Sequence, residues 1–333
     1  DKIKRHVGSS ATVATAGIEI EGRYEVENYS IGDINTGGYS LSFINSDGVS
    51  AESFVGKSQA GVMNVKLQLA STAVSDAMYN AVTGGASFNV SHYEEKAREG
   101  FNAVDGMVYQ TGMAKVVDMN GISFSALGSV YAASYDSGFI HADSRVASFG
   151  MATDVMSAKA GMMFSHESFS AGKEQRDGFL GGSGVATGTG AAFFVAKGGL
   201  VNKQLSYMMG VSMSTSKLGS VEIGPLVWDK HVTSVVSSQF GLDYRFASGF
   251  TLGGYASSQV VVKGATQKVK AYSAVNAFDA SSSDIDFTFA KPASWLAGIE
   301  AGYITNSGLK TLVFAKAGSG KFTAYGLKVS SSS

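Results

Sequence analysis

Histidines are the first residues to consider for catalysis or metal binding, and this chain has five of them. They lie far apart, with no HExxH motif and no pair four residues apart (His6, His92, His141, His166 and His231). Such pairs are the usual start of a helical zinc site, and the chain has no cysteine to supply thiolate ligands. The sequence therefore predicts no metal site and no cofactor.

A run of the residue types found in catalytic triads occurs at Ser165-His166-Glu167. Adjacent residues of a strand point to opposite faces, so these neighbours cannot form a triad among themselves. No G-x-S-x-G motif marks a nucleophilic serine. A hydrolase has only scattered polar residues in its favour, and we predict no catalytic residues and no enzyme.

Two other stretches resemble binding sites. Residues 181–190 are rich in glycine but lack the Lys-Ser/Thr pair of a phosphate-binding loop, so a mobile loop or turn is expected there. Near the amino terminus, glutamates alternate with apolar residues over 18–27. They could form an acidic metal site, but we expect the solvated face of a surface strand.

Five charged residues elsewhere fall on the polar faces of alternating segments: Lys159, Asp243, Arg245, Lys263 and Glu300. If the strands form a barrel, these side chains would line its lumen and could pair with one another or with a helix inside it. If the strands form a soluble sandwich, they are ordinary surface charges. The residues alone leave both interpretations open.

The elements that carry these charges are strands. The clearest hairpin runs from about Ser234 to Ser257, where Phe240, Leu242 and Tyr244 alternate with small or charged residues up to a turn at 247–249. A period of two places the aromatic residues on one face and the charges on the other. Such a face suits the core of a sandwich or the lipid side of a barrel.

Similar alternation continues from about 107 to 329. Candidate strands cover 108–117, 121–135, 156–165, 205–214, 284–289, 295–303 and 323–329. Aromatic residues recur near strand ends, as in an interfacial girdle (Trp228, Tyr244, Phe246, Phe250, Trp295 and Tyr303). At about 10 residues per spanning strand, the region has room for roughly ten to twelve strands. That number suits a barrel or a large sandwich.

Composition narrows the class of protein. There are 42 glycines and 2 prolines, and charged residues make up only 16% of the chain, which is sparse for a freely soluble surface. The 26 Lys and Arg residues nearly balance the 27 Asp and Glu residues, so no nucleic-acid partner is indicated.

No apolar run is long enough for a transmembrane helix. No apolar segment follows residues 2–6, so no signal peptide is predicted: either the protein is cytoplasmic or this is a processed or trimmed part of a larger precursor, and we expect the second.

The first hundred residues have a different organisation. Residues 1–57 read as β structure, with strands over 18–27 and 39–43 and a turn at 45–48. From Gln59 to Val82 apolar residues follow a helical period, and Gly84-Gly85 supplies the stop. This helix could pack on a sheet or lie inside a barrel lumen. A second, charged helical stretch is expected over 93–101.

The middle and end of the chain resemble a known family. Asp177–Gly182, the glycine-rich run to Ala192, Phe193–Gly199 and the strand ending at Tyr207–Val211 look like the centre of an autotransporter translocator domain, most similar to those attached to subtilisin-like passengers. Phe289–Trp295 and the strand that follows resemble the late hairpin of those domains. The resemblance covers roughly 150–329 and is one of pattern. It implies a C-terminal barrel, usually of twelve strands, in the outer membrane, with a helix through its pore that joins it to a secreted passenger.

From this we expect an all-β protein, an antiparallel transmembrane β-barrel of about 12 strands with an amino-terminal β segment and a plug helix. The expected domains are 1–57, the end of a passenger; 58–106, the helical linker or plug; and 107–333, the barrel. Expected partners are outer-membrane lipid, the barrel-assembly machinery and the chain's own passenger segment, and the expected location is the bacterial outer membrane and cell surface.

One departure from the family concerns the carboxyl terminus. Family members end on an aromatic residue that the insertion machinery reads, whereas this chain ends in four serines, 330–333. The expectation is that the terminal residues were removed or replaced. The main alternative function is a soluble or surface-displayed β-rich structural protein, such as an adhesin, a filament subunit or a phage tail component.

Overall fold

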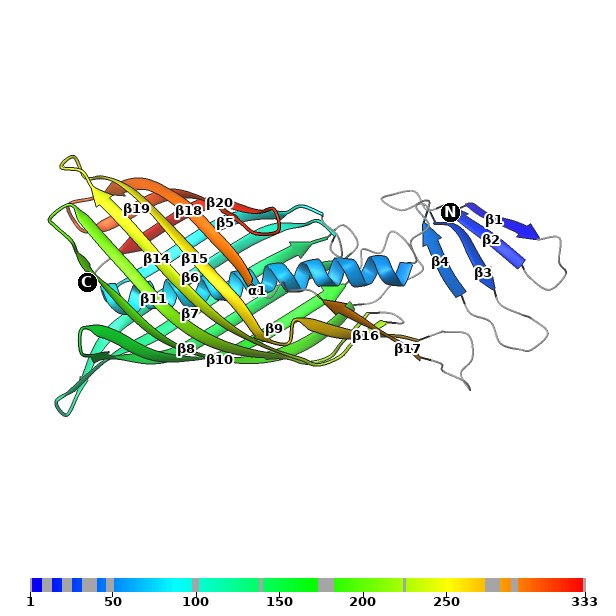
Figure 1. Cartoon of the computed structure of the whole chain (residues 1–333), viewed down its shortest axis with the longest axis horizontal. Coiled ribbons are helices and arrows are strands. Elements are labelled where there is room, and N and C mark those ends of the chain that lie inside the picture. The colour runs from blue at the N-terminus through cyan, green and yellow to red at the C-terminus, as the bar shows by residue number, and fades with distance from the viewer. Residues whose placement is uncertain are drawn as a thin grey trace.

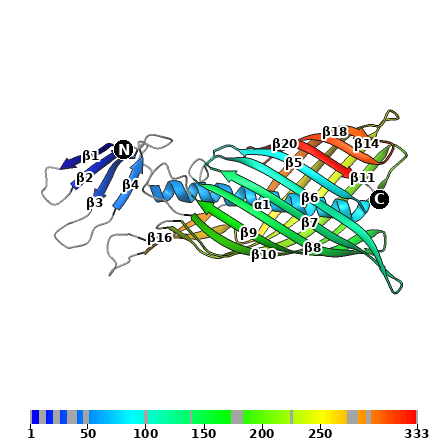
Figure 2. The same cartoon turned by 180° about the vertical axis from the view of Figure 1, so that it is seen from behind.

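The computed structural model describes residues 2–7, 14–19, 26–31, 41–45, 51–97, 102–137, 140–172, 183–223, 226–272, 282–288 and 293–331. Twelve of its strands close into an antiparallel barrel around one long helix, α1 (Figure 1, Figure 2). The barrel strands are β5 (Ala86–Glu95), β6 (Val104–Met119), β7 (Ile122–Asp136), β8 (His141–Val155), β9 (Ala158–Gly172), β10 (Ser183–Leu200), β11 (Leu205–Leu218), β14 (His231–Arg245), β15 (Phe250–Lys263), β18 (Ala293–Ile304), β19 (Leu309–Gly318) and β20 (Phe322–Ser331). The predicted barrel and its number of strands are confirmed.

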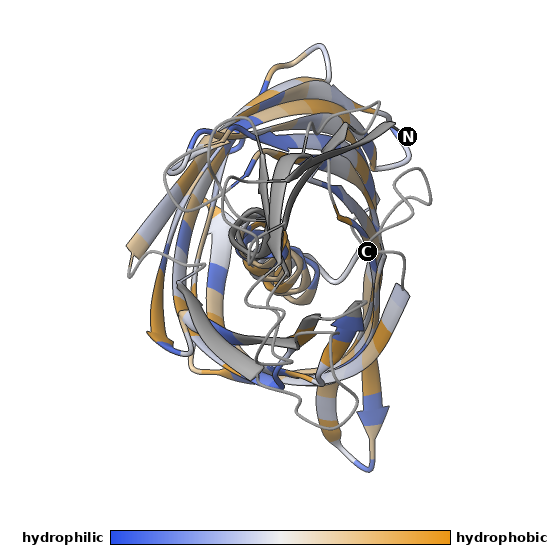
Figure 3. Cartoon of the chain, turned by 90° about the vertical axis from the view of Figure 1, so that its right-hand side faces the viewer, coloured by the Kyte–Doolittle hydropathy of each residue, from blue (hydrophilic) through white to orange (hydrophobic). Residues whose placement is uncertain are grey.

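The helix α1 spans Ala51–Thr83, so the predicted helix over Gln59–Val82 is confirmed but begins earlier. It ends where Gly84 adopts a φ of 67°, a left-handed conformation that glycine allows, and the Gly84 N–H bonds to the Asn80 carbonyl at 2.8 Å. Viewed along the barrel, the helix lies inside the ring of strands (Figure 3). Of the two interpretations of this helix, the one inside a lumen is correct.

Among the described residues, no helix is long and apolar enough to cross a lipid bilayer.

The second predicted helix, over 93–101, is wrong. Residues 86–95 form β5, in which burial alternates, and Tyr93 and Glu95 are almost completely buried on the inner face. The charges of residues 93–101 suggested a helix. In the structure the side chains of 86–95 alternate between the inner and outer faces of the barrel, which is the period of a strand. The barrel wall therefore begins at Ala86 rather than at 107, and residues 98–101 lie outside the described residues.

The two ends of the barrel differ. At one end, here called the short-turn end, the strands are joined by turns of two to four residues (120–121, 156–157, 201–204, 246–249 and 305–308). Asn120 and Gly121 have φ of 51° and 81°, as the tightest hairpin turns require. Met156, predicted within a strand, lies in such a turn with a φ of 57°. The opposite end, the long-loop end, carries most of the longer connections and the start of α1.

Two of those connections build a small sheet. Strands β12 (Val221–Ile223), β13 (Leu226–Trp228), β16 (Thr266–Tyr272) and β17 (Ser282–Thr288) pair in that order. The strand predicted near 284–289 therefore lies in this sheet and not in the barrel wall, and Phe289 is outside the described residues. Trp228 is completely buried, so it is not a member of an interfacial girdle.

The amino-terminal segment is a separate antiparallel sheet of β1 (Lys2–Val7), β2 (Ala14–Glu19), β3 (Val26–Ile31) and β4 (Leu41–Asn45). The predicted β structure is present, but the single strand expected over 18–27 is wrong, because Ile18 of β2 pairs with Val26 of β3 and the two therefore lie on neighbouring strands. Residues 20–25 and the predicted turn at 46–48 lie outside the described residues.

The barrel wall has an apolar outer face and a polar or small inner face. On β11 and β14, Met209, Val211, Phe240 and Leu242 are 45%, 54%, 45% and 41% exposed on the outside. On the same two strands, Ser212 and Ser237 pair with each other and are buried on the inside. The predicted hairpin at 234–257 corresponds to β14 and β15, with this alternation along both strands.

Glycines on the inner face make room for large neighbours on adjacent strands. A Cβ at Gly161 of β9 would lie 2.3 Å from the ring of Phe194 on β10, and one at Gly190 would lie 2.4 Å from Ser165 Oγ. The loop expected over 181–190 is therefore wrong from Ser183 onward: these small residues are the first half of β10 and lie against crowded strands.

This crowding predicts the effect of a single methyl group. Gly161→Ala should lower the free energy of unfolding by about 1–3 kcal/mol, because the new methyl group would overlap the buried Phe194 ring and would lie 2.9 Å from Ala152 Cβ. Gly128→Ala is the matched control, since the nearest atom to its new methyl group is Met113 Cγ at 3.8 Å. Urea unfolding followed by circular dichroism measures both, and equal losses would contradict the packing described.

Candidate functional site in the helix-filled lumen

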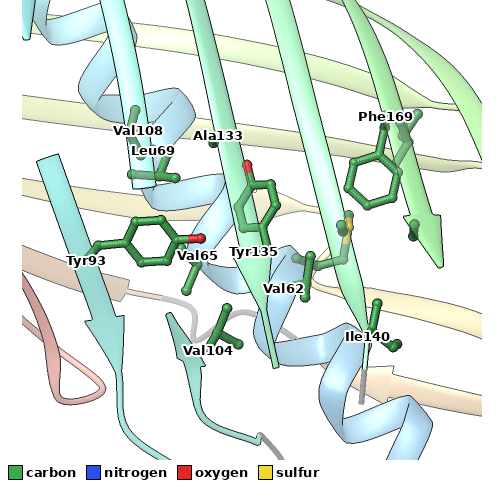
Figure 4. Close-up of a cluster of buried hydrophobic side chains, with 14 of the residues drawn as sticks. Val62, Val65, Leu69, Tyr93, Val104, Val108, Ala133, Tyr135, Ile140 and Phe169 are labelled. Atoms are coloured by element: carbon green, nitrogen blue, oxygen red, sulfur yellow. The ribbon is translucent and has the colours of Figure 1, made fainter. Parts of the chain in front are cut away.

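The first half of α1 packs against one side of the wall through apolar side chains. Val62, Val65 and Leu69 face a cluster on the strands that includes Tyr93, Tyr135 and Phe169 (Figure 4). Val62, Val65, Tyr93 and Phe169 have no exposed surface. This contact with the β5–β9 side positions the helix off the opposite wall.

Polar side chains of α1 are buried as well, because the wall around them is polar. Asn64 donates from Nδ2 to Glu95 Oε2 at 2.6 Å, and Asn80 donates to Ser87 Oγ at 3.0 Å. The Ser71 and Ser237 hydroxyls lie 3.0 Å apart on opposite sides of the same space. Asn64, Ser71 and Asn80 thus bond to the wall, as burial demands, whereas Asn80 Oδ1 and the side-chain amide of Gln59 have no hydrogen-bond partner among the described residues.

One ion pair joins the helix to the wall near its first half. Lys66 Nζ lies 2.8 Å from Glu167 Oε2 of β9, and each side chain is 9% exposed. Ser144 of β8 donates its hydroxyl to the other carboxylate oxygen. Because both charges are nearly dry, removal of either partner would leave an uncompensated charge in the interior.

A second ion pair lies further along the helix and on another side. Lys328 Nζ of β20 is 2.9 Å from Asp76 Oδ1. Asn89 of β5 donates to the other oxygen of Asp76 at 3.1 Å, and the Lys328 ammonium lies 5.0 Å from the centre of the Tyr79 ring. Asp76 therefore connects the helix to the two strands whose pairing closes the barrel.

A third cluster belongs to the wall alone. Lys310 Nζ of β19 contacts Asp243 Oδ2 at 2.8 Å and Glu300 Oε1 at 3.1 Å. A Cβ at Gly253 would lie within 3.1 Å of both carboxylates, so this glycine leaves the space they occupy. The cluster lies on the inner face beside α1.

The five charged residues predicted to line a lumen do not lie together in the structure. Asp243 and Glu300 are in the lumen and share Lys310. Lys159 pairs with Asp154 at 3.0 Å, beside the β8–β9 turn. Arg245 and Lys263 are exposed at the ends of β14 and β15. The last three are therefore not brought together with the other two.

Several lumenal charges were missed by sequence reasoning: Lys66, Asp76, Glu167, Lys310, Lys316 and Lys328. The three lysines of β19 and β20 share the period-two face of the strands, and that period would have located them. Asp76 lies on the more polar face of the helix, with Asn64, Gln68, Ser71 and Ser75, but nothing in that spacing marks Asp76 or Lys66 as the partner of a charge on the wall.

The space between α1 and the β14–β20 side is a cavity of about 390 Å³. The helix lines it with Gln68, Thr72, Asp76 and Tyr79. The charged residues that the wall contributes are Asp243, Glu300, Lys310, Lys316 and Lys328. The helix thus leaves its larger cavity on this side, and a smaller one of about 100 Å³ lies on the other side, beside Lys66 and Glu167.

The residue types first considered for chemistry are not brought together. His166 is exposed on the outer face of β9, whereas its neighbour Glu167 is buried on the inner face. Within the described residues, no three His, Asp or Glu side chains are grouped as metal ligands. The polar residues of the lumen form hydrogen bonds and ion pairs with α1.

The buried pair Lys66–Glu167 generates a prediction. Lys66→Met should cost about 3–5 kcal/mol of unfolding free energy, because Glu167 keeps a buried charge, whereas Lys66→Met with Glu167→Leu should be near the native value. The control is Lys159→Met, whose partner Asp154 is 72% exposed, with an expected cost of about 0–1 kcal/mol. Urea unfolding of the four proteins decides the matter, and a double variant as unstable as Lys66→Met would refute the pairing.

No protein-family model matches the sequence, and no curated protein matches it. Solved structures do. The translocator domain of the autotransporter NalP from Neisseria meningitidis aligns with a TM-score of 0.54 and 14% identity, over 83% of this chain and 97% of that chain. The beta domain of the Bordetella autotransporter BrkA gives 0.49 and 9% (75% and 99% covered), and the transport unit of AIDA-I from Escherichia coli gives 0.49 and 11% (75% and 89%). At 14% identity, the similarity to the NalP domain shows a shared fold.

Proposed function

We propose that this chain is the outer-membrane translocator and anchor of an autotransporter-like surface protein, a type V secretion system. The observation that carries the proposal is the inverted wall: large apolar side chains cover the outside while charges and a helix occupy the inside. A monomeric soluble protein rarely exposes a continuous apolar surface of this kind. A barrel in lipid requires one.

The closed topology of the barrel supports the same proposal. In hydrocarbon every backbone N–H and C=O must find a partner within the protein, so only helices and closed barrels span it. All twelve barrel strands here have partners on both sides. The partners we assign are outer-membrane lipid around the wall, the barrel-assembly machinery that inserts it, and the chain's own amino-terminal segment.

The proposed orientation follows from the two ends. Outer-membrane barrels have short turns on the periplasmic side and longer loops outside. The short-turn end would face the periplasm, and the long-loop end, from which α1 leads to strands β1–β4, would face outward. Residues 1–57, which include the first turns of α1, would be the end of a passenger, and the rest of α1 would be the linker that plugs the pore. A passenger of the subtilisin-like kind is the finer hypothesis.

The mechanism would be physical and not enzymatic. A lumen lined by glycine, serine and scattered charges lets an extended chain pass without binding it through an apolar surface. Once α1 occupies the pore, the buried pairs at Lys66 and Asp76 hold it in place. The lumenal charges Asp243 and Glu300 would act within the wall, since Lys310, with which both form ion pairs, belongs to it.

The orientation can be tested because the chain has no cysteine. Single cysteines replace Lys230, exposed at the long-loop end, and Met156, exposed at the tip of the β8–β9 turn. On intact cells a membrane-impermeant maleimide should label Lys230→Cys and not Met156→Cys, whereas permeabilised cells should show both. Equal labelling of the two on intact cells, or the reverse order, would overturn the proposal.

The outer face yields a stability prediction. Val211→Arg places a charge midway along the outer face of β11 and should cost about 2–4 kcal/mol in lipid vesicles. Val201→Arg, at the short-turn end, should cost about 0–1 kcal/mol. Urea unfolding from vesicles measures both. A soluble structural protein, the alternative function, would tolerate both exposed substitutions equally and stay monodisperse without detergent.

A further inference from the structure

The cavity beside α1 contains three lysines, and two of them have carboxylate partners. Lys310 contacts Asp243 and Glu300, and Lys328 contacts Asp76. Lys316 of β19 lines the same cavity, and within the described residues no carboxylate lies within ion-pair distance of its ammonium. The three carboxylates that line the cavity are each in contact with one of the other two lysines.

Aromatic rings hold the Lys316 ammonium in place. It lies 4.7 Å from the centre of the Phe314 ring and 5.2 Å from that of the Tyr255 ring. Such contacts attract a cation to a ring face but leave its N–H groups without acceptors. The Lys316 side chain is therefore positioned and still available to bind an anion.

Tyr255 brings a second donor to the same place. It belongs to β15, and Gly298 of β18 lies between it and Lys316 in the sheet, since Tyr255 pairs with Gly298 and Gly298 with Lys316. A Cβ at Gly298 would lie 2.6 Å from the Tyr255 ring and 2.7 Å from its hydroxyl oxygen. The tyrosine thus leans over the glycine, and its buried hydroxyl has no hydrogen-bond partner.

The surroundings define what could fill this space. The cavity volume of about 390 Å³ is within the range of small-molecule sites, and Leu296, Leu312 and Phe314 supply apolar lining. We propose that the lumen holds a binding site for a small carboxylate with an apolar or aromatic body, its carboxylate on Lys316 and Tyr255 and its body against Phe314 and Leu296. The site does not depend on the proposed function in secretion.

The test uses the whole chain in lipid nanodiscs and the probe 4-fluorobenzoate, followed by fluorine NMR with empty nanodiscs as the baseline. Binding should be saturable, and Lys316→Gln should weaken it about tenfold or more, as loss of a charge-assisted hydrogen bond does. Lys316→Arg should retain most of it. Lys159→Gln, which removes a lysine outside the cavity, should bind like the native protein.

Two further arms separate a specific site from partition into lipid. The neutral analogue 4-fluorobenzyl alcohol should bind much more weakly, and Tyr255→Phe should weaken binding of the benzoate by a smaller factor than Lys316→Gln. Unchanged far-ultraviolet circular dichroism shows that each variant is folded. Absence of saturable binding to the native protein, equal binding by folded Lys316→Gln, or equal binding of the neutral analogue would overturn the proposal.

Discussion

The pairing of the last strand with the first is the constraint on which the rest of this structure depends. Ten residues of β20, Phe322 to Ser331, pair with Glu95 to Ala86 of β5. Without this seam, two strand edges would present unpaired N–H and C=O groups, each of which costs several kcal/mol in hydrocarbon. Closure at twelve strands also fixes the diameter. The interior is then too wide for wall side chains alone, and a helix about 10–12 Å across occupies it.

The helix packs closely against one side of the barrel wall and borders a cavity on the other. Its apolar residues meet the apolar cluster on the β5–β9 side, where burial of Val62 and Val65 is complete. Its polar residues bond to the same strands and to β20: Asn64 and Asn80 to β5, Lys66 to β9, and Asp76 to β5 and β20. The apolar contact lies on one side of the helix, and the larger cavity remains on the other. Asp76 binds Lys328 of β20 and Asn89 of β5, on either side of the seam.

Much of the architecture could be predicted from the spacing of apolar residues in the sequence. The β14–β15 hairpin, the long strands and the helix ending at Gly84 follow from alternation, helical spacing and a glycine stop. The failures have physical reasons. The end of β5, residues 93–95, was predicted as the start of a helix because its charges masked the alternation, and Ser183–Gly190 was predicted as a loop because small residues carry no apolar signal. Alternation along β14 and along β18 places Asp243 and Glu300 on polar strand faces, whereas their shared contact with Lys310, like that of Lys66 with Glu167, is made only by the tertiary structure.

The most direct test of the account is the environment of successive residues along β14. Spin labels placed one at a time at residues 237–242, in protein reconstituted into vesicles, report collision with oxygen, which concentrates in lipid, and with a water-soluble nickel complex. The account predicts alternation, with high oxygen access at 238, 240 and 242 and nickel access or restriction at 237, 239 and 241. High nickel access at Phe240 and Leu242, or no period of two, would contradict a barrel whose apolar face meets lipid.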